Sequence, residues 1–322
     1  MKRESDCKSW LSSYIYFKGD IYESECDRII LSVVKPLVLY GKEKKWFDKY
    51  FFIRYGERGS HIRLRFFGDT KKLTNNFKLY IKNYINTFAD KELLSIPLSV
   101  PGQPEYDSNL IWIDYEPEIE RYGGEEAVKL AEEFFCYSSE AAIELIKQME
   151  LNDRSSRLGK GLLSTLILIY VFLPDRKQAS NFFNQYSGGY LMALGTTEDL
   201  KSMWVDAFNN GFDKQSEKLI EFINLIWEAL ENNDELSGTL DVYKNNIIII
   251  KEKLKILFDT GVINKNGIKI ENWYDCVRMI ISSYVHMMNN RLGISIKEEA
   301  YISHLINKAL ITEKISNRNS ND

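Results

Sequence analysis

The sequence predicts an α+β fold, with a mixed, mainly antiparallel sheet in the N-terminal half and a helical layer in the C-terminal half. Up to about residue 116, the chain is rich in aromatic runs of β-forming residues, each bounded by Gly, Pro, Asp or Asn. Beyond that point, apolar residues recur at helical spacing. In addition, the short segment 56–60 (GERGS) holds two glycines, which predicts a hairpin between the strands on either side.

The N-terminal half contains segments with strand composition, predicted at 9–17, 45–56, 60–68, 94–100 and 110–118. Two amphipathic helices interrupt them, at about 22–40 and 70–88. Strands that alternate with helices in this way, with at least one hairpin, are typical of a sheet that has helices packed on one face.

The C-terminal half is predicted to consist of helices, at 124–149, 155–173, 178–194, 197–210, 213–232, 238–259, 272–291 and 295–312. The last of these opens with a capping box, formed by Ser295 and by Glu298 three residues later. There is no repeat period, and no Gly/Ser-rich or Pro-rich linker separates the halves. We therefore expect a single domain over residues 1–312, followed by a disordered tail over residues 313–322.

Composition excludes several classes of function. A chain of 322 residues with 44% hydrophobic content can bury a large core. The net charge of −4, with both signs mixed, does not fit a nucleic-acid binder, so an anionic partner would need a local cluster of cations. The four cysteines form no CxxC pair, which argues against a zinc or redox site and fits reduced thiols in a cytoplasm.

The chain also lacks the sequence signals of membrane association. Its start has no apolar run typical of a signal peptide. The apolar segment GLLSTLILIYVFL is shorter than the roughly 20 residues that a membrane-spanning helix needs. We therefore predict a soluble, cytoplasmic protein.

The strand predicted at 60–68 carries ionisable side chains along one face. Because side chains alternate along a strand, His61, Arg63 and Arg65 lie on one side and the apolar residues between them on the other. The preceding strand adds Arg54 to the same hairpin. Like charges on neighbouring strands repel, so the cluster indicates an anion held between guanidinium groups, which grip carboxylates at two points. A polar face in contact with water is the alternative.

A second stretch joins this half to the helices. Gly123 and Gly124 precede a long helix whose first turn contains Glu125 and Glu126. Helix entry alone explains these residues, since glycines shape the turn and acids favour a helix N-terminus. In the functional interpretation, Arg121 extends from this turn to the arginine-bearing strand as another anion contact.

The third stretch is SSYVHMMNNRLGIS, residues 282–295. On a helix, His286 shares a face with Asn290, and it is one of only three histidines in the chain. It could exchange protons near neutral pH, although a packing role is the usual one for a single histidine on a helix. The chain has no GxGxxG after a strand, no GxxxxGK[ST], no HExxH and no GxSxG, so no cofactor and no metal are predicted.

Together these stretches resemble the small C-terminal elimination domain of class I lantibiotic dehydratases, and equally its stand-alone relatives in thiopeptide biosynthesis, which include [4+2] pyridine synthases. The matching segments are WFDKYFFIRYGERGSHIRLRFFG, YEPEIERYGGEEAVKLAEEFFCYSS and SYVHMMNNRLGI. The resemblance runs in order from about Ser9 to Leu310. A chain of this length leaves no room for the large glutamyl-transferring portion of a full dehydratase.

The resemblance to the elimination domain implies β-elimination. A Ser or Thr of a leader-bearing precursor peptide arrives as its glutamyl ester, and loss of the Cα proton and of glutamate leaves dehydroalanine or dehydrobutyrine. Four residues stand where that family has its catalytic Arg and His: Arg63, Arg65, Arg121 and His286. By this resemblance, His286 would transfer the proton and Arg121 would contact the departing glutamate. Cations would also stabilise the enolate-like charge.

The resemblance to thiopeptide enzymes implies a different reaction, in which two dehydroalanines join in a formal [4+2] cycloaddition and the leader peptide is lost. Such an enzyme mainly holds its two reacting groups together. Tyr284 and Trp273 would suit its pocket, although aromatic residues more often pack in a core. The residues assigned to substrate binding in either reaction are Arg54, His61, Tyr284 and Asn290.

A third possibility is a non-catalytic subunit that binds a leader peptide as an added strand. All three interpretations predict the same main partner, a ribosomally made precursor peptide with a leader and a core. A separate glutamyl-transferring subunit is a further expected partner. Membranes and nucleic acids are not expected to bind, and the oligomeric state is left open.

Overall fold

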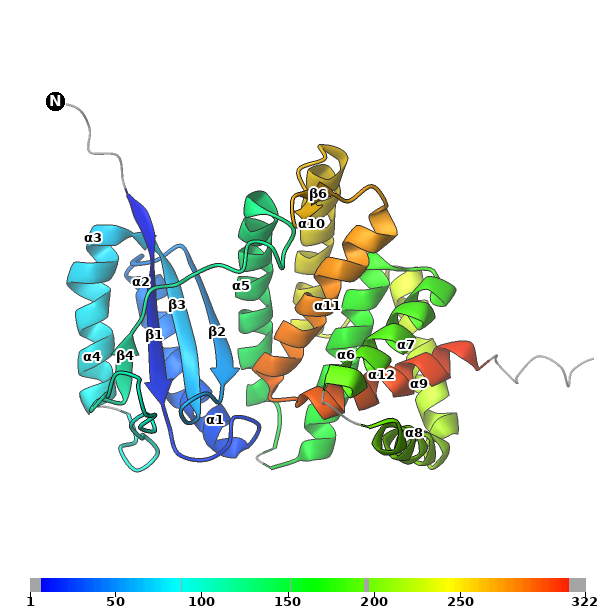
Figure 1. The fold of residues 1–322 in the computed structure, drawn as a ribbon, viewed down its shortest axis with the longest axis horizontal. Coiled ribbons are helices and arrows are strands. Elements are labelled where there is room, and N and C mark those ends of the chain that lie inside the picture. The colour runs from blue at the N-terminus through cyan, green and yellow to red at the C-terminus, as the bar shows by residue number, and fades with distance from the viewer. Residues whose placement is uncertain (1–6, 88, 151, 194–196, 313–322) are drawn as a thin grey trace, which may run out of the picture.

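The structure is a computed structural model that describes residues 7–87, 89–150, 152–193 and 197–312. The fold is α+β, as the sequence predicts, with a four-stranded sheet near the N-terminus and helices throughout the C-terminal part. In Figure 1 the sheet lies on the left and the C-terminal helices on the right, with α5 (Glu125–Lys147) between them.

The sheet has the strand order β2-β3-β1-β4, and each neighbouring pair is antiparallel. The strands are β1 (Lys8–Tyr16), β2 (Lys49–Tyr55), β3 (His61–Asp69) and β4 (Leu110–Trp112). The hairpin predicted across 56–60 joins β2 to β3. The strand predicted at 94–100 is wrong, because only Leu94 forms a bridge there, and Pro97 cannot donate to a ladder. The strand predicted at 110–118 is shortened to β4.

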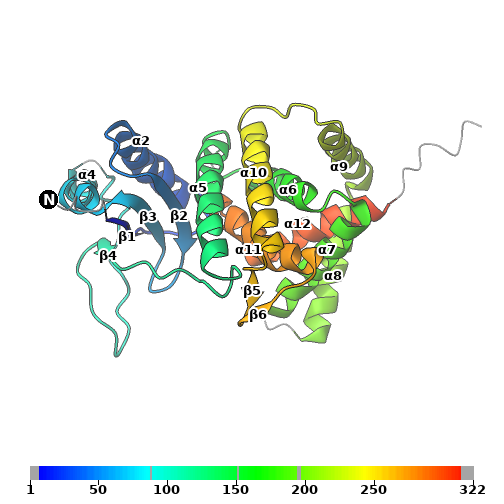
Figure 2. The ribbon, with the colours of Figure 1, turned by 90° about the horizontal axis from the view of Figure 1, so that it is seen from above.

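Two helical segments cover one face of the sheet, and each includes a π-helical turn. The first contains α1 (Ser24–Ile29), η1 (Ile30–Val34) and α2 (Lys35–Glu43), and the second contains α3 (Thr70–Lys72), η2 (Leu73–Phe77) and α4 (Lys78–Thr87). Figure 2 shows α2 and α4 on the same side of the sheet. Beneath them Ile62, Leu64 and Phe66 are completely buried, as the alternation of β3 predicts.

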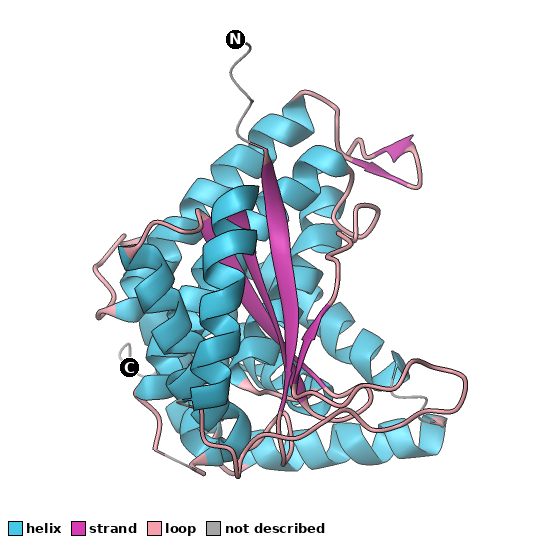
Figure 3. Cartoon of the chain, turned by 90° about the vertical axis from the view of Figure 1, so that its left-hand side faces the viewer, coloured by secondary structure: helices cyan, strands magenta, loops and turns pink. Residues whose placement is uncertain are grey.

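The remaining helices agree closely with the predicted ones. They are α6 (Arg154–Phe172), α7 (Arg176–Ala193), α8 (Glu198–Asp213), α9 (Ser216–Glu231), α10 (Thr239–Asp259), α11 (Trp273–Leu292) and α12 (Ile296–Ile311). The capping box of α12 is confirmed, because Ser295 Oγ accepts from the Glu298 amide and the Glu298 carboxylate accepts from the Ser295 amide. A small hairpin of β5 (Asn264–Lys265) and β6 (Ile268–Lys269) was not expected, and it projects from the molecule in Figure 3.

A buried ion network joins the sheet to the C-terminal helices. The Asp27 carboxylate accepts a hydrogen bond from Arg54 Nη2 at 2.6 Å and also pairs with Arg157. Burial alone would raise the pKa of Asp27, but the two guanidinium groups outweigh it and lower that pKa. Helix α11 ends beside this network at Gly293, whose φ of 74° and close contact with Arg54 leave no room for a side chain. The network therefore fixes how α11 meets the sheet.

One continuous cluster of buried apolar residues runs through both parts of the molecule, from Leu11 to Leu310. The single domain expected over residues 1–312 stays a prediction. The predicted tail, residues 313–322, lies outside the described residues. Within the described ranges, no helix combines the length and the apolar character that crossing a membrane requires.

Candidate functional site

The face of the sheet opposite α2 and α4 forms the floor of a cavity of about 670 Å³. The strand register brings Tyr14 of β1 and Ile53 of β2 next to Arg63 on this face. The segment that follows β4 and one face of α11 form the walls. All four residues predicted to be catalytic line this cavity: Arg63, Arg65, Arg121 and His286. Residues from three distant parts of the chain therefore meet at one place.

Arg63 is held between aromatic rings. Its Cζ lies 3.3 Å from the centre of the Tyr55 ring and 4.8 Å from that of Tyr14. Its Nε donates to His61 Nε2 at 3.4 Å, and its Nη2 lies 3.6 Å from a carboxylate oxygen of Glu57. Cation–π contacts and hydrogen bonds thus restrict the guanidinium to a position at the cavity.

Arg65 is buried and lacks a full set of partners. Its side chain lies on the rings of Phe51 and Tyr115, with Cζ 5.2 Å and 4.5 Å from their centres. Its Nε is buried and has no hydrogen-bond partner among the residues that the structure describes. Burial also lowers the pKa of Arg65. A buried guanidinium without an anion is destabilising by several kcal/mol, so an anionic ligand in the cavity that Arg65 lines would stabilise it by supplying the opposite charge.

Arg121 is placed by the turn that leads into α5. Gly123 and Gly124 take φ values of 90° and 116°, which favour glycine and let the chain turn sharply before the helix. Arg121 Nε donates to Ser283 Oγ of α11 at 3.0 Å, and its Nη1 lies 3.2 Å from the Glu118 carboxylate. Its side chain is 41% exposed, so this guanidinium remains accessible from solvent.

His286 is paired with a buried carboxylate. Its Nδ1 lies 2.9 Å from Glu299 Oε1 of α12, and the Tyr186 hydroxyl donates to Glu299 Oε2 at 2.8 Å. Because a carboxylate only accepts hydrogen bonds, Nδ1 carries the proton and Nε2 is the basic nitrogen of the neutral ring. Nε2 makes no hydrogen bond within the described part of the chain, so it is the nitrogen left for a ligand.

Glu299 was not identified from the sequence. It is completely buried. Burial raises its pKa, and the hydrogen bonds from His286 and Tyr186 oppose that shift. Its only local signal is its place in the first turn of a helix, where acidic residues are common for a general reason, the helix dipole. The pairing with His286 depends on how α11 and α12 pack, which the sequence pattern does not specify.

The cavity also has an acidic side. Asp114, Glu116 and Glu118 line it from the segment after β4, together with Tyr115. Burial raises the pKa of Tyr115 strongly, so its hydroxyl stays neutral. The cavity therefore offers cations on the strand floor and carboxylates on one wall, a pattern that suits a ligand bearing both charges.

Arg54, predicted as a substrate contact, does not line this cavity. The register pairs Arg54 with Ile62, so its side chain lies on the helix-covered face rather than beside Arg63. It is completely buried, and its guanidinium donates to Asp27 and to the carbonyl oxygens of Ile21 and Arg291. The prediction placed it on the wrong face, because a shift of one residue in register reverses the two faces of a strand.

The other predicted contacts have different positions. Tyr284 is completely buried away from the cavity and stacks on Phe134 at 4.1 Å. His61 is also buried and outside the cavity lining, and burial lowers its pKa to about 4, so it is a neutral support for Arg63. Asn290 does line the cavity, and its amide exchanges two hydrogen bonds of 3.0 Å with the backbone of Arg54.

Known proteins resemble this chain in sequence. The chain matches the family model described as lantibiotic biosynthesis dehydratase C-term over residues 10–310. It is 23% identical to the epidermin biosynthesis protein EpiB of Staphylococcus epidermidis, over 97% of this chain and 27% of that protein. It is 24% identical to the nisin biosynthesis protein NisB of Lactococcus lactis subsp. lactis, over 82% of this chain and 22% of that protein. The chain thus spans about a quarter of the length of these curated relatives.

Two solved structures have a similar fold. One is a pyridine synthase, TbtD, from thiomuracin biosynthesis, with a TM-score of 0.70, 13% identity, and coverage of 94% of this chain and 97% of that one. The other is the tRNA dependent lantibiotic dehydratase MibB from Microbispora sp. 107891, with a TM-score of 0.63, 19% identity, and coverage of 96% of this chain and 28% of that one. At these identities the likeness is one of fold.

Proposed function

The chain belongs to the lantibiotic biosynthesis dehydratase C-terminal family, and from this premise we propose that it eliminates glutamate from a glutamylated Ser or Thr in a ribosomally made precursor peptide. The product would be dehydroalanine or dehydrobutyrine. The observation that carries the proposal is the buried guanidinium of Arg65, whose Nε has no partner among the described residues, in a cavity shared with His286.

The charges of the cavity support a glutamyl group as the ligand. A glutamyl ester carries one free carboxylate and one ammonium group. Arg63 and Arg65 would bind the carboxylate in two-point geometry. The ammonium group would pair with Asp114 or Glu116 on the acidic wall. Serine or threonine without glutamate carries neither charge, so the unmodified residue would leave the arginines and the carboxylates of this cavity without charged partners.

The residues can be assigned to the steps of the elimination. His286 Nε2 accepts the Cα proton, and the electron pair of that C–H bond forms the Cα–Cβ double bond. The Cβ–O bond breaks at the same time, and glutamate leaves as a carboxylate that Arg65 and Arg121 stabilise. The imidazolium that forms is stabilised by Glu299 through the bond to Nδ1, and it then releases its proton to water.

This chemistry implies a supplier for the substrate. Elimination requires a hydroxyl that already carries glutamate, because hydroxide itself is a poor leaving group. We therefore infer that a glutamyl-transferring dehydratase subunit acts before this site on the same precursor peptide. The peptide would then have to reach both active sites in turn.

A second candidate is the formal [4+2] cycloaddition of two dehydroalanines to form a pyridine, with loss of water and of the leader peptide. It is favoured by the fold likeness to the pyridine synthase TbtD, in which each chain covers nearly all of the other. The aromatic rings of Tyr14, Tyr55 and Tyr115 line the cavity and would suit two stacked unsaturated groups.

Mass spectrometry of two substrates tests these proposals. One substrate is a precursor peptide with an O-glutamyl serine, and the other is a dehydrated, azole-containing peptide with its leader. Loss of glutamate from the first supports elimination, and leader release from the second supports cyclisation. In either case His286→Ala should abolish the reaction. Full activity of His286→Ala would contradict both, and binding of both peptides without any reaction would indicate a peptide-binding subunit.

A further inference from the structure

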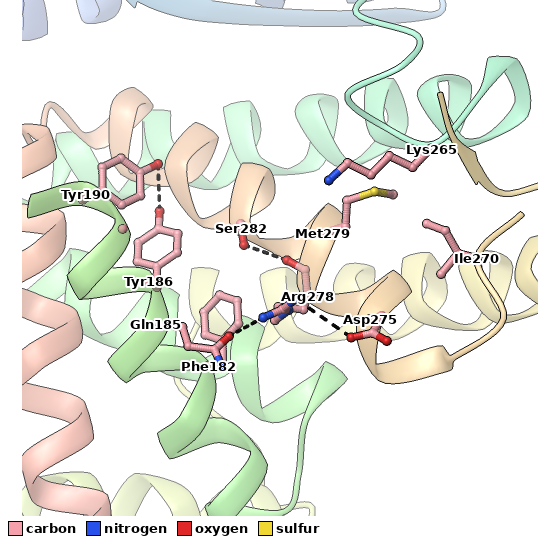
Figure 4. Close-up of a pocket in the computed structure, with 11 residues that line it drawn as sticks. Phe182, Gln185, Tyr186, Tyr190, Lys265, Ile270, Asp275, Arg278, Met279 and Ser282 are labelled. Atoms are coloured by element: carbon pink, nitrogen blue, oxygen red, sulfur yellow. Dashed lines mark hydrogen bonds and ion pairs between the residues drawn. The ribbon is translucent and has the colours of Figure 1, made fainter. Parts of the chain in front are cut away.

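A second cavity lies along the same helix as His286. It has a volume of about 580 Å³ and is formed between α7, α11 and the β5–β6 hairpin. Figure 4 shows its lining side chains, with Tyr186 and Tyr190 from α7 on one side and Lys265 and Ile270 on the other. Its volume falls within the range of sites that bind small molecules or side chains in proteins.

The two cavities follow each other on one face of α11. Arg278 and Ser282 line the second cavity, and His286 and Asn290 line the first. These residues are spaced four apart, so they lie in one row on the helix surface. Tyr190 lines the second cavity, and its ring centre lies 5.9 Å from that of His286 in the first. A ligand that reaches from one cavity to the other would therefore follow α11.

The spacing fits a peptide. The four helical steps from Ser282 to His286 span about 6 Å, and the seven steps from Met279 to His286 span about 10 Å. An extended peptide advances about 3.3 Å per residue. A substrate whose reacting residue lies at His286 would thus place the residue two or three positions away at the second cavity.

The chemistry of the walls indicates the kind of side chain. Phe182, Ile270 and Met279 offer apolar surface. Most polar groups of the lining are already engaged: the Tyr186 hydroxyl contacts Glu299 and the Tyr190 hydroxyl, and Arg278 binds Gln185 and lies near Asp275. Lys265 adds a cationic group at the hairpin side of the cavity. Apart from Lys265, ring faces and apolar atoms are what the cavity offers a ligand, and these favour a bulky apolar side chain over a polar one.

We propose that this second cavity, here named the side-chain pocket, binds one bulky aliphatic or aromatic side chain of the precursor peptide, two or three residues from the residue being modified. The proposal rests on the proposed function of the first cavity for its reference point. It would make the enzyme select the residues that flank its target.

Two adjacent glycines of α7 provide a matched test. Gly189 lines the side-chain pocket, whereas Gly188 does not, and a Cβ added at either position meets no atom within 4 Å. Gly189→Leu should fill the pocket, and Gly188→Leu should change the same helix equally without filling it. Both substitutions raise helix propensity, so both variants should fold, which circular dichroism and thermal denaturation can check.

The measurement is the binding of fluorescent peptides by anisotropy. In each peptide an amide replaces the ester that links glutamate to the target residue, so that glutamate cannot be eliminated. The residues two and three positions before and after the target are either Leu or Ala. For the native chain, Leu at one of these positions should lower Kd about tenfold. Gly189→Leu should reduce this preference to less than twofold with Kd of the Ala peptide unchanged, and Gly188→Leu should keep the preference.

The same series with dehydroalanine in place of the glutamylated residue separates this inference from the proposed function. Failure to eliminate glutamate from the ester peptide would refute the proposed elimination. The side-chain pocket would still stand if the native chain prefers Leu at a flanking position and Gly189→Leu removes that preference. Equal preferences in the native chain and Gly189→Leu would overturn the pocket. An equal loss of the preference for Leu in Gly188→Leu and Gly189→Leu would also overturn the pocket. The same holds if the native chain binds neither series of peptides, or binds them without any preference for Leu.

Discussion

The pairing of His286 with Glu299 leads to the sharpest prediction. Glu299→Gln preserves the shape of the side chain and keeps an acceptor for Tyr186, but it removes the negative charge 2.9 Å from Nδ1. Hydrogen bonds to charged groups contribute about 1.5–3 kcal/mol, and Glu299 is completely buried, so water does not screen this one. Because this charge stabilises the imidazolium that forms when Nε2 accepts the Cα proton, kcat/KM should fall about 10- to 150-fold.

The pH dependence should change as well. Burial raises the pKa of Glu299 in the native chain. The native rate should therefore fall as the pH falls through that raised pKa, because the protonated carboxyl no longer stabilises the imidazolium, and the acidic limb of Glu299→Gln should lack this fall. Burial raises the pKa of the tyrosines that face the pair, Tyr22, Tyr186 and Tyr190, so these stay neutral in this range.

The assay is elimination from an O-glutamyl peptide, followed by mass spectrometry from pH 5 to 9. Glu298→Gln is the matched control, because this neighbouring carboxylate binds Arg154 and caps α12 instead of contacting His286. The control should lose stability while retaining activity per folded molecule. If Glu299→Gln and Glu298→Gln have the same kcat/KM and the same acidic limb, Glu299 only supports packing and the reasoning is refuted.

Other substitutions give further predictions. Arg65→Met should weaken binding of the amide-linked glutamyl peptide about 10- to 100-fold. The same variant should have a free energy of unfolding higher by on the order of 1 kcal/mol in thermal denaturation, because a poorly partnered buried charge is removed. Asp27→Asn should lower the free energy of unfolding by about 3–5 kcal/mol at pH 7 in urea denaturation, since it leaves Arg54 and Arg157 buried without their carboxylate. Because the native pKa of Asp27 is lowered, its stabilisation is complete above the unfolded value near pH 4 and is lost as pH falls through the native value, so this deficit should shrink as the pH falls below the unfolded value. Asn290→Ala should cost about 1–3 kcal/mol by the same assay, because it unpairs two backbone groups of β2.

The arginine-bearing face of β3 was predictable because strand alternation is a local rule. The residues that were misplaced depend on relations between elements. Arg54 required the register of the hairpin, which pairs Tyr55 with His61 and so puts Arg54 opposite Ile62. Tyr284 lies two residues from His286, about 200° around the helix, and therefore faces away from any cavity that His286 lines.

The pairing of Glu299 with His286 could not be predicted from the sequence pattern. It is only 13 residues from His286 in the chain, but a helix end and a tight turn lie between them. Which residue of α12 meets the imidazole depends on how the two helices pack. That is set by side chains throughout the core, so a motif search along the chain does not reveal it. Capping residues such as Ser295 were predictable because their hydrogen bonds close within four residues.

The side-chain contacts along β2 have a consequence for assembly. An outer strand of a sheet normally presents free N–H and C=O groups that can recruit an extended segment from another molecule. Here the side-chain amide of Asn290 makes hydrogen bonds with both the backbone N–H and the backbone C=O of Arg54. Ser139 Oγ accepts a hydrogen bond from the backbone N–H of Phe52. This border of the sheet is thus closed to strand addition, and a peptide that docks as an extra strand would have to use the opposite border, beside the three-residue β4.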